Sequence, residues 1–399
     1  MSFDLNGMMR DMMKKEGLGK ENTITITNNL GLDILDYRNG KIEDGYVLTG
    51  VNDARILTAA GKSGTGKSSL LVQGAWNIVK DIPNATVQIW DYERSHTLSR
   101  IEAMTGASAD EIKSKFMILN SEISIEKMYK AIRGLAKIKC DNFDALAIDS
   151  GRVDDNGDPF MILPPTIIII DSWSTMVSDK VIDVDNVELG LSNMTGATQA
   201  KDNNNILNSL VPVLEQARIS LFIVAHISKK VETGPVKTAA QINYLGQDEN
   251  IAGGGKCIYL ADTFYKLTAG SKLEPDKDFG VKGFMVKVKT CKSRSNEAGQ
   301  EVELVYEQKR GFSNALSNFN FIKKAGMLGG NGRAYYIKSD KYPQLADIKF
   351  TQKTFIEKYD SNEEFKAMFD DICQEMYMDF IYKPEAYDKV DESPEEFEE

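Results

Sequence analysis

The stretch of sequence that decides the fold is AAGKSGTGKSS, which runs from Ala59 to Ser69. It follows the apolar segment ARILTAA and precedes SSLLVQGAWNIVKDI, so a buried strand and a helix are predicted on its two sides. Residues 61–68 match the pattern G-x-x-x-x-G-K-[ST] in this strand–loop–helix context, which is typical of a phosphate-binding loop. The residues predicted to surround the phosphates are Gly61, Lys62, Ser63, Gly64, Thr65, Gly66, Lys67, Ser68 and Ser69.

Each residue type in this loop has a physical role in holding a triphosphate. The glycines let successive backbone N–H groups face the phosphates, and the N-terminus of the next helix adds partial positive charge. Lys67 reaches the β- and γ-phosphate oxygens, and the Ser68 hydroxyl is a ligand for Mg²⁺. A chance glycine turn is the alternative, but the flanking strand and helix favour nucleotide binding.

Strand and helix patterns alternate after the loop. TVQIW at 86–90 and TLSRIEAMTG at 97–106 come first, followed by the continuous apolar strands PTIIIIDS at 165–172 and SLFIVAHI at 220–227. Continuous apolar strands separated by helices predict an α/β fold with a mainly parallel sheet, whose ligands bind at the carboxyl ends of the strands. Within this pattern the region 150–165 indicates a hairpin insertion that turns at residues 154–156.

Composition limits the class of protein. The chain has 399 residues and a net charge of −11, but seven acidic residues and one lysine lie between residues 388 and 399, whereas residues 279–296 carry only basic charges. Local charge decides whether phosphate can approach, so the acidic total does not exclude nucleic acid. Four widely spaced cysteines and two histidines argue against a zinc site, and no long apolar run predicts a membrane span or secretory signal. We therefore expect a cytoplasmic protein with no membrane partner.

Two carboxylates follow predicted strands. Asp171 closes TIIIID, where a carboxylate can meet the outer shell of a bound Mg²⁺, although an aspartate that only caps the next turn is an alternative. Glu93 follows QIW by three residues and is placed to orient an attacking water. Asp91 competes with Glu93 for that role.

A histidine and a long polar loop come later. His226 ends LFIVAH and is expected beside the γ-phosphate if its strand neighbours that of Asp171; a core histidine is the alternative. The following 30 residues have little apolar periodicity, which is typical of a functional loop or of a solvated surface loop. The residues expected to bind a polyanion there are Lys229, Lys230, Lys237, Gly254, Gly255 and Lys256.

Lys292 and Arg294 lie in a charged turn after FMVKVKT. Lysines on one face of a strand are usually only solvated. A K-x-R pair on a turn can instead place cations on the γ-phosphate bound by a neighbouring copy, which couples hydrolysis to assembly.

The ordered set of these features resembles the RecA-type recombinases, nearest to their phage-encoded UvsX branch. The set comprises NNLGLDIL at 28–35, the phosphate loop, Glu93, IIIIDSWST, the strand with His226, the glycine-bearing loop and the K-x-R turn. Further local similarity lies in SNMTGATQAKDNNNILNSLVPVLEQARISLFIVAH and GGGKCIYLADTFYKL. The resemblance covers roughly residues 28–380 and is weakest in the insertion and at both ends.

The resemblance implies a RecA-like ATPase that binds single-stranded DNA as an ATP-bound helical filament and exchanges it into a homologous duplex. It implies that Glu93 activates water, that His226 is a nucleotide switch, and that Lys292 and Arg294 act across the subunit interface. Residues 179–193 and about 228–256 would be the two DNA-binding loops. Where many members stack a tyrosine on adenine this chain has Arg100, with Thr97 where an aspartate is common, so the base preference stays open.

The predicted organisation has four parts. Residues 1–30 are expected to form an N-terminal subunit-contact arm, with a Met-rich helix at 3–15 and a strand at 23–27 that packs on its own domain or on a neighbour's sheet edge. Residues 31–315 form the ATPase core, and 316–385 a small α+β C-terminal domain. Residues 386–399 form an acidic tail. Expected partners are single- and double-stranded DNA, further copies of the chain, and mediator and single-strand-binding proteins.

Two other classes of protein fit parts of the pattern. A hexameric phage-type replicative helicase shares the phosphate loop, a strand ending in histidine and a K-x-R turn, but the module after residue 315 and the short N-terminal arm argue against it. A nucleotide-gated assembly protein that polymerises without nucleic acid is the second alternative.

Overall fold

The fold is described from a computed structural model of the chain. It describes residues 24–120, 124–154, 157–176, 206–229, 244–246, 248–253, 255–294, 298–331 and 333–383, together with Met8 and Met12. The predicted DNA-binding loop at 179–193, nearly all of the Met-rich helix at 3–15 and the acidic tail at 386–399 lie outside these residues.

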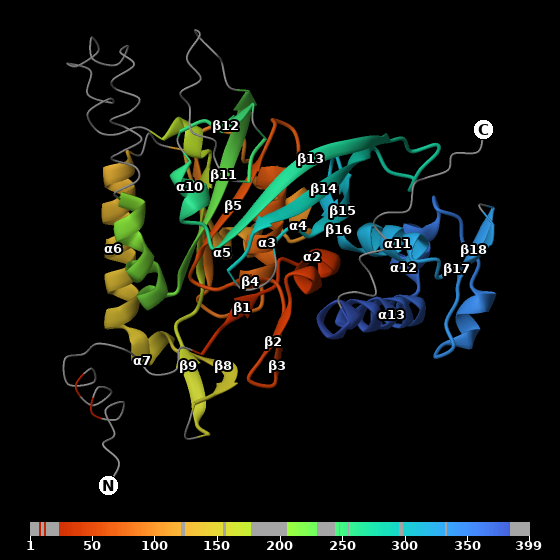
Figure 1. The fold of residues 1–399 in the computed structure, drawn as a ribbon, viewed down its shortest axis with the longest axis horizontal. Coiled ribbons are helices and arrows are strands. Elements are labelled where there is room, and N and C mark those ends of the chain that lie inside the picture. Colours follow the sequence, from red (N-terminus) through yellow and green to blue (C-terminus); the bar gives the residue numbers. More distant parts are fainter. Residues whose placement is uncertain are drawn as a thin grey trace.

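A central sheet organises the molecule (Figure 1). Within the described chain it has ten strands, and six of them run parallel in the order β13-β5-β11-β10-β6-β7. The parallel strands are β5 (Ile56–Gly61), β6 (Thr86–Asp91), β7 (Phe116–Leu119), β10 (Thr166–Asp171), β11 (Ile219–Lys229) and β13 (Thr263–Leu273). The α/β prediction with a mainly parallel sheet is confirmed, and the sheet is compatible with a Rossmann- or RecA-like core.

The remaining strands extend this sheet with antiparallel pairs. After β13 the order continues through β14 (Gly283–Lys292), β15 (Glu301–Glu307) and β16 (Gly311–Ser313), while β12 (Glu249–Ile251) pairs with the end of β11. Short connections join β14, β15 and β16, which antiparallel pairing permits, whereas each parallel pair needs a crossover.

Both faces of the central parallel strands β5 and β10 are buried because helices cover each face of the sheet. Along β10, Ile167 and Ile169 enter one apolar cluster while Ile168 and Ile170 enter the other, as the two-residue period of a strand requires. The first face is covered by α3 (Lys67–Val79), α4 (Leu98–Thr105) and α5 (Ala109–Lys115), and the second by α6 (Ile125–Asp141) and a helix over 206–217. The apolar run TIIIID is therefore explained by two-sided burial.

The predicted insertion is a hairpin. Strand β8 (Ile148–Val153) pairs antiparallel with β9 (Pro159–Ile162), after the short helix α7 (Phe143–Leu146), and the Asp154 N–H donates to the Asp158 carbonyl across the turn at 2.9 Å. The Arg152 guanidinium lies 3.8 Å from the ring centre of Tyr46, which belongs to the hairpin of β2 (Lys41–Glu43) and β3 (Tyr46–Leu48). Figure 1 shows the two hairpins together, below the sheet.

The N-terminal prediction is partly wrong. Residues 24–26 are not in a strand; only β1 (Thr27–Asn28) is, and it pairs with β4 (Val51–Asn52) of the same chain. Next to these two residue pairs, the Asp53 N–H donates to the Ile26 carbonyl at 2.9 Å. Helix α2 (Asp33–Arg38) follows.

Beyond the sheet lies a group of helices with a small hairpin on its outer side (Figure 1). Its elements are α11 (Asn314–Lys324), β17 (Leu328–Asn331), β18 (Ala334–Ile337), a 3₁₀ turn at Pro343–Asp347, α12 (Phe355–Ser361) and α13 (Glu363–Tyr382). Its centre is aromatic: the rings of Phe319 and Phe355 stack at 4.4 Å, and those of Phe350 and Phe369 lie against Phe355. The composition is that of the predicted α+β module, but its core is continuous with one face of the sheet.

Two composition-based expectations can be compared with the structure. All four cysteines lie within the described residues and are free thiols. In the same part of the chain, no helix combines the length and the apolar character that crossing a membrane requires.

Candidate functional site

The glycine-rich loop joins the carboxyl end of β5 to the N-terminus of α3, as the sequence predicts. Gly64 and Gly66 have φ angles of +77° and +87°, which favour glycine. A Cβ on Gly66 would lie 2.9 Å from the Phe312 ring, and one on Gly61 would lie 2.5 Å from the Leu267 carbonyl oxygen. The N-cap of α3 is Gly66, which has no side chain to cap the helix, so the first N–H groups of α3 remain available to an anion.

Lys67 is buried at the start of α3, with 4% of its surface exposed. Its Nζ donates to the Lys62 carbonyl at 2.7 Å, and the Thr65 hydroxyl donates to the same oxygen at 2.9 Å. Burial lowers the pKa of Lys67, and the negative charges of Asp171 and Glu93 oppose that shift. The ammonium group is therefore held inside the loop close to both predicted carboxylates.

Asp171 ends β10 next to the loop and is 1% exposed. Burial raises the pKa of this carboxyl, but hydrogen bonds from His96 and Ser68 and the charge of Lys67 outweigh burial, so the pKa is lowered overall. Oδ2 accepts from His96, whereas the buried Oδ1 has no hydrogen-bond partner among the described residues. An ionised carboxylate with one unsatisfied buried oxygen beside a serine hydroxyl fits the outer shell of a Mg²⁺ ion.

Glu93 and His226 lie in direct contact. Glu93 Oε1 is 2.8 Å from His226 Nε2 and accepts a hydrogen bond from the Ser172 hydroxyl at 2.6 Å. His226 lies opposite Gly61 in the pairing of β11 with β5, and β11 neighbours β10, as the sequence-based hypothesis required. The expectation that the strand ends at His226 is wrong: β11 continues to Lys229 because β12 pairs with this extension.

Asp91 has a structural role that separates it from Glu93. Its carboxylate accepts the backbone N–H groups of Ser95 at 3.0 Å and His96 at 2.8 Å, which closes a turn in which Arg94 has a φ of +53°. Of the two candidates at the end of β6, Glu93 contacts His226, which lies opposite Gly61 of the loop, whereas Asp91 holds the turn. The turn also brings His96 against Asp171, a contact that the sequence did not lead us to expect. The available signal was Asp91, because an aspartate shortly before a Ser-His pair can accept their backbone N–H groups and close a turn.

Arg100 is held by its own chain. Its guanidinium donates to the carbonyls of Gln308 at 2.9 Å and Lys309 at 2.5 Å, and to the Tyr306 hydroxyl at 2.9 Å. The Tyr306 hydroxyl is in turn 3.2 Å from the Ser69 hydroxyl. Arg100 is therefore linked to the loop through one tyrosine and ties α4 to the turn after β15.

Lys292 and Arg294 lie where the parallel strands of the sheet begin, which we call the amino edge. The end of the strands that carries the loop is the carboxyl edge. Lys292 ends β14, and its Nζ donates to the carbonyls of Tyr259 at 2.6 Å and Ile258 at 3.3 Å, at the C-terminus of α10 (Lys256–Tyr259). The expectation that Lys292 lies in a turn is therefore wrong, because the strand extends to it. Arg294 is exposed, and its N–H donates to the Asp262 carbonyl at 3.1 Å.

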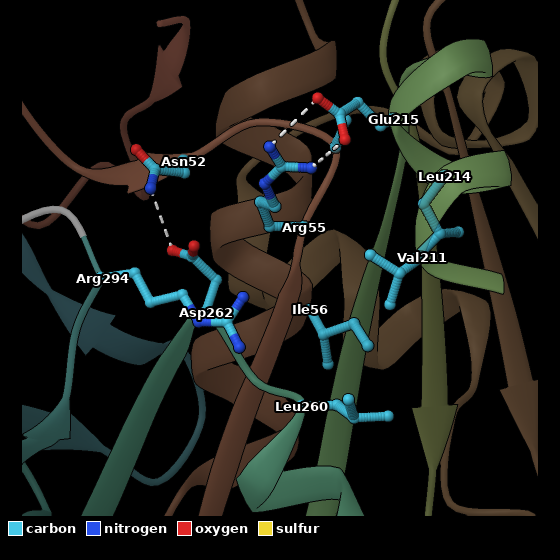
Figure 2. A pocket seen from close by; sticks show the side chains of 10 residues that line it. Asn52, Arg55, Ile56, Val211, Leu214, Glu215, Leu260, Asp262 and Arg294 are labelled. Carbon is cyan, nitrogen blue, oxygen red and sulfur yellow. Dashed lines mark hydrogen bonds and ion pairs between the residues drawn. The ribbon is translucent and has the colours of Figure 1, made fainter. Parts of the chain in front are cut away.

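Arg294 lines a cavity of about 400 Å³ at this amino edge (Figure 2). The other lining residues are Asn52, Ala54, Arg55, Ile56, Val211, Leu214, Glu215, Leu260 and Asp262. Because Ile56 begins β5 and Gly61 ends it, a rise of five residues along the strand, or about 17 Å, separates this edge from the loop. An arginine side chain is shorter than that, so Arg294 does not reach the loop of its own chain.

Three of the six predicted polyanion-binding residues fall on described positions. Lys229 is exposed at the end of β11, Gly255 is the N-cap of α10, and Lys256 is half-buried in its first turn. Lys230, Lys237 and Gly254 lie outside the described residues.

A scan against protein-family models and a search of curated proteins each found no match. The chemistry of the site therefore has to be inferred from its own residues. In the described part of the chain, no group of three or more His, Cys, Asp or Glu side chains is arranged to hold a metal. A Mg²⁺ ion here would depend on Ser68, on water held by Asp171, and on oxygens of a bound triphosphate, which is how Mg²⁺ is usually held in nucleotide sites.

Proposed function

We propose that this protein is an ATP-dependent DNA recombinase that forms helical filaments on single-stranded DNA and catalyses homologous pairing and strand exchange. The observation that carries the proposal is the meeting of Lys67, Asp171 and the Glu93–His226 pair at the carboxyl edge of the sheet, beside an uncapped helix N-terminus. This arrangement supports hydrolysis of a nucleoside triphosphate.

In this proposal the residues divide the chemistry. Lys67 exchanges the Lys62 carbonyl for phosphate oxygens, and the N–H groups of the loop and of α3 hold the phosphate chain. Bound Mg²⁺ would neutralise charge on the phosphates. Glu93 orients the attacking water, and His226 and Ser172, which share one Glu93 oxygen, fix the direction of that carboxylate.

Assembly is supported by the distance between the two edges. A cation at the amino edge can meet a nucleotide only if the carboxyl edge of another copy docks there. Such a contact uses two different surfaces, so it repeats head to tail and builds a ring or a helix. The position of Arg294 therefore supports a polymer in which each nucleotide lies between two copies.

The DNA-binding part of the proposal rests on the resemblance and on the course of β11. His226 and Lys229 lie three residues apart on this one strand. A shift of His226 caused by loss of the γ-phosphate can therefore pass directly along the backbone to the start of the predicted DNA-binding loop. A filament whose DNA affinity depends on the bound nucleotide needs two conformational states that differ in their affinity for DNA. Contacts to the DNA backbone are expected, with sequence matching left to base pairing.

Electron microscopy tests the proposal directly. The protein is incubated with single-stranded DNA and a slowly hydrolysed ATP analogue, and helical filaments are expected. Exchange of a single strand into a homologous duplex is then measured by gel. Closed six-membered rings that unwind a forked duplex without a homologous donor would instead identify a helicase, and polymers that do not retain DNA would identify an assembly protein.

A mixing experiment tests the shared nucleotide site. Arg294→Ala and Lys67→Met are each expected to abolish hydrolysis, because one lacks the cation supplied to a neighbour and the other lacks the phosphate lysine. In a random equal mixture about a quarter of head-to-tail junctions contain both intact groups, so activity should return. Lys289→Ala, an exposed change on β14, is the matched control and should be fully active. No recovery on mixing would contradict the shared site.

A further inference from the structure

His96 is a buried side chain that the proposed chemistry does not use. Its ring is 3% exposed, Asp171 is 1% exposed, and Nε2 lies 2.9 Å from Asp171 Oδ2. No solvent competes for this contact, so the link is stronger than the same pair on a surface. The imidazole thus occupies one oxygen of the carboxylate that the site would use beside a metal.

The chain fixes both ends of this link. Asp91 and Asp171 are register partners at the carboxyl ends of the neighbouring strands β6 and β10. Asp91 accepts the backbone N–H of His96 at 2.8 Å and thereby folds the turn back over the sheet. The histidine is held through its backbone by one carboxylate while its ring bonds the other. This arrangement leaves little freedom for the ring to turn away.

The ionisation of Asp171 determines which hydrogen the ring carries. An aspartate carboxylate is normally ionised at neutral pH, so it accepts hydrogen bonds and has none to donate. Nε2 must therefore carry a hydrogen and donate it to Oδ2. The other oxygen, Oδ1, stays buried and without a partner among the described residues. An unsatisfied buried carboxylate oxygen is a good acceptor for a water molecule bound to a metal.

We propose that His96 is the positioning residue of Asp171: its Nε2–H holds Oδ2, so that Oδ1 is the oxygen left for metal-bound water beside Ser68. This inference rests on the proposed function, because it assumes that a Mg²⁺–nucleotide complex occupies the loop. Partners that orient a metal-site carboxylate typically change metal affinity by 10- to 100-fold when they are replaced.

The test compares His96→Leu, which removes the donor, with His96→Gln, whose amide can donate from a similar position. A fluorescent ATP analogue is titrated at a series of Mg²⁺ concentrations and in the presence of EDTA. His96→Leu should raise the Mg²⁺ concentration for half-maximal binding about 10- to 100-fold, and change binding in EDTA by less than about 2-fold. His96→Gln should restore most of the Mg²⁺ dependence. An equal loss with and without Mg²⁺ would indicate a merely structural role and overturn the inference.

A second measurement reads the hydrogen position in the wild-type protein, and a variant serves only to assign the signals. The chain has two histidines, His96 and His226, so a histidine-labelled nuclear magnetic resonance spectrum contains two ring systems. The spectrum of His96→Gln assigns them. The His96 ring should carry a hydrogen on Nε2; a ring with hydrogen only at Nδ1 would overturn the inference. Wild-type protein that binds the analogue without any Mg²⁺ dependence would overturn the proposed function as well, whereas normal Mg²⁺ dependence in His96→Leu overturns the role of His96 alone.

Discussion

Replacing Lys67 by methionine should weaken nucleotide binding without lowering the stability of the free protein. Lys67 donates a charged hydrogen bond from a position that is 4% exposed, so its interaction with phosphate would be little weakened by solvent. Hydrogen bonds to charged groups contribute about 1.5–3 kcal/mol. At about 1.4 kcal/mol per factor of ten, Lys67→Met should weaken ATP binding about 10- to 150-fold.

The free protein should respond differently. Burial lowers the pKa of Lys67, so the native state disfavours the charged ammonium, and methionine removes that unfavourable charge. The Lys62 carbonyl keeps the Thr65 hydroxyl as a donor, so no acceptor is left without a partner. The free energy of unfolding without nucleotide should therefore stay the same or rise.

The assay pairs two measurements on each protein. A fluorescent ATP analogue gives the dissociation constant, and denaturant unfolding without nucleotide gives the stability. Lys80→Met is the matched control, because Lys80 is exposed at the C-cap of the same helix, α3, away from the loop. If Lys67→Met bound ATP within about threefold of wild type, or lost affinity only because it unfolded, the assignment of Lys67 to the phosphates would be wrong.

Two further predictions concern backbone and charge. Gly66→Ala should destabilise the protein or weaken nucleotide binding by about 2–4 kcal/mol, because it combines a left-handed φ of +87° with a Cβ 2.9 Å from an aromatic ring. Gly106→Ala is its control: it has a φ of +72° with no atom within 4 Å, so about 1–2 kcal/mol is expected, and equal losses in the two variants would show that the ring contact does not matter. Burial lowers the pKa of Lys139 to about 7, against about 10.4 for an unfolded chain. Between these values the unfolded chain binds the extra proton, so stability should rise with pH from about 7 to about 10, measured by urea unfolding. Lys139→Met should flatten this rise, and an unchanged pH profile in the variant would assign it to other groups.

The sequence by itself determined the parts of the molecule that depend on local pattern. Continuous apolar strands separated by helices specify an α/β sheet. Successive strand residues point to opposite faces, so all of them must be apolar when helices cover both faces. The loop at 61–68 was likewise readable, since left-handed glycines and a helix start are local features. The hairpin after Ile148 followed from its turn residues. That Glu93 and His226 belong to the same edge followed from both coming after apolar runs predicted as parallel strands, although β11 itself continues to Lys229.

Only the tertiary structure decided which side chains meet across strands. The contact of His96 with Asp171, the sharing of Glu93 by Ser172 and His226, and the extension of β11 to Lys229 all depend on strand order and register. The placement of Arg294 at the edge away from the loop has the same origin, because β14 runs antiparallel to β13 and carries its end back to the start of β5. Periodicity along a chain records which face of an element is buried, but not which element lies beside it. Strand pairing is a contact between residues far apart in sequence, and no local pattern encodes it.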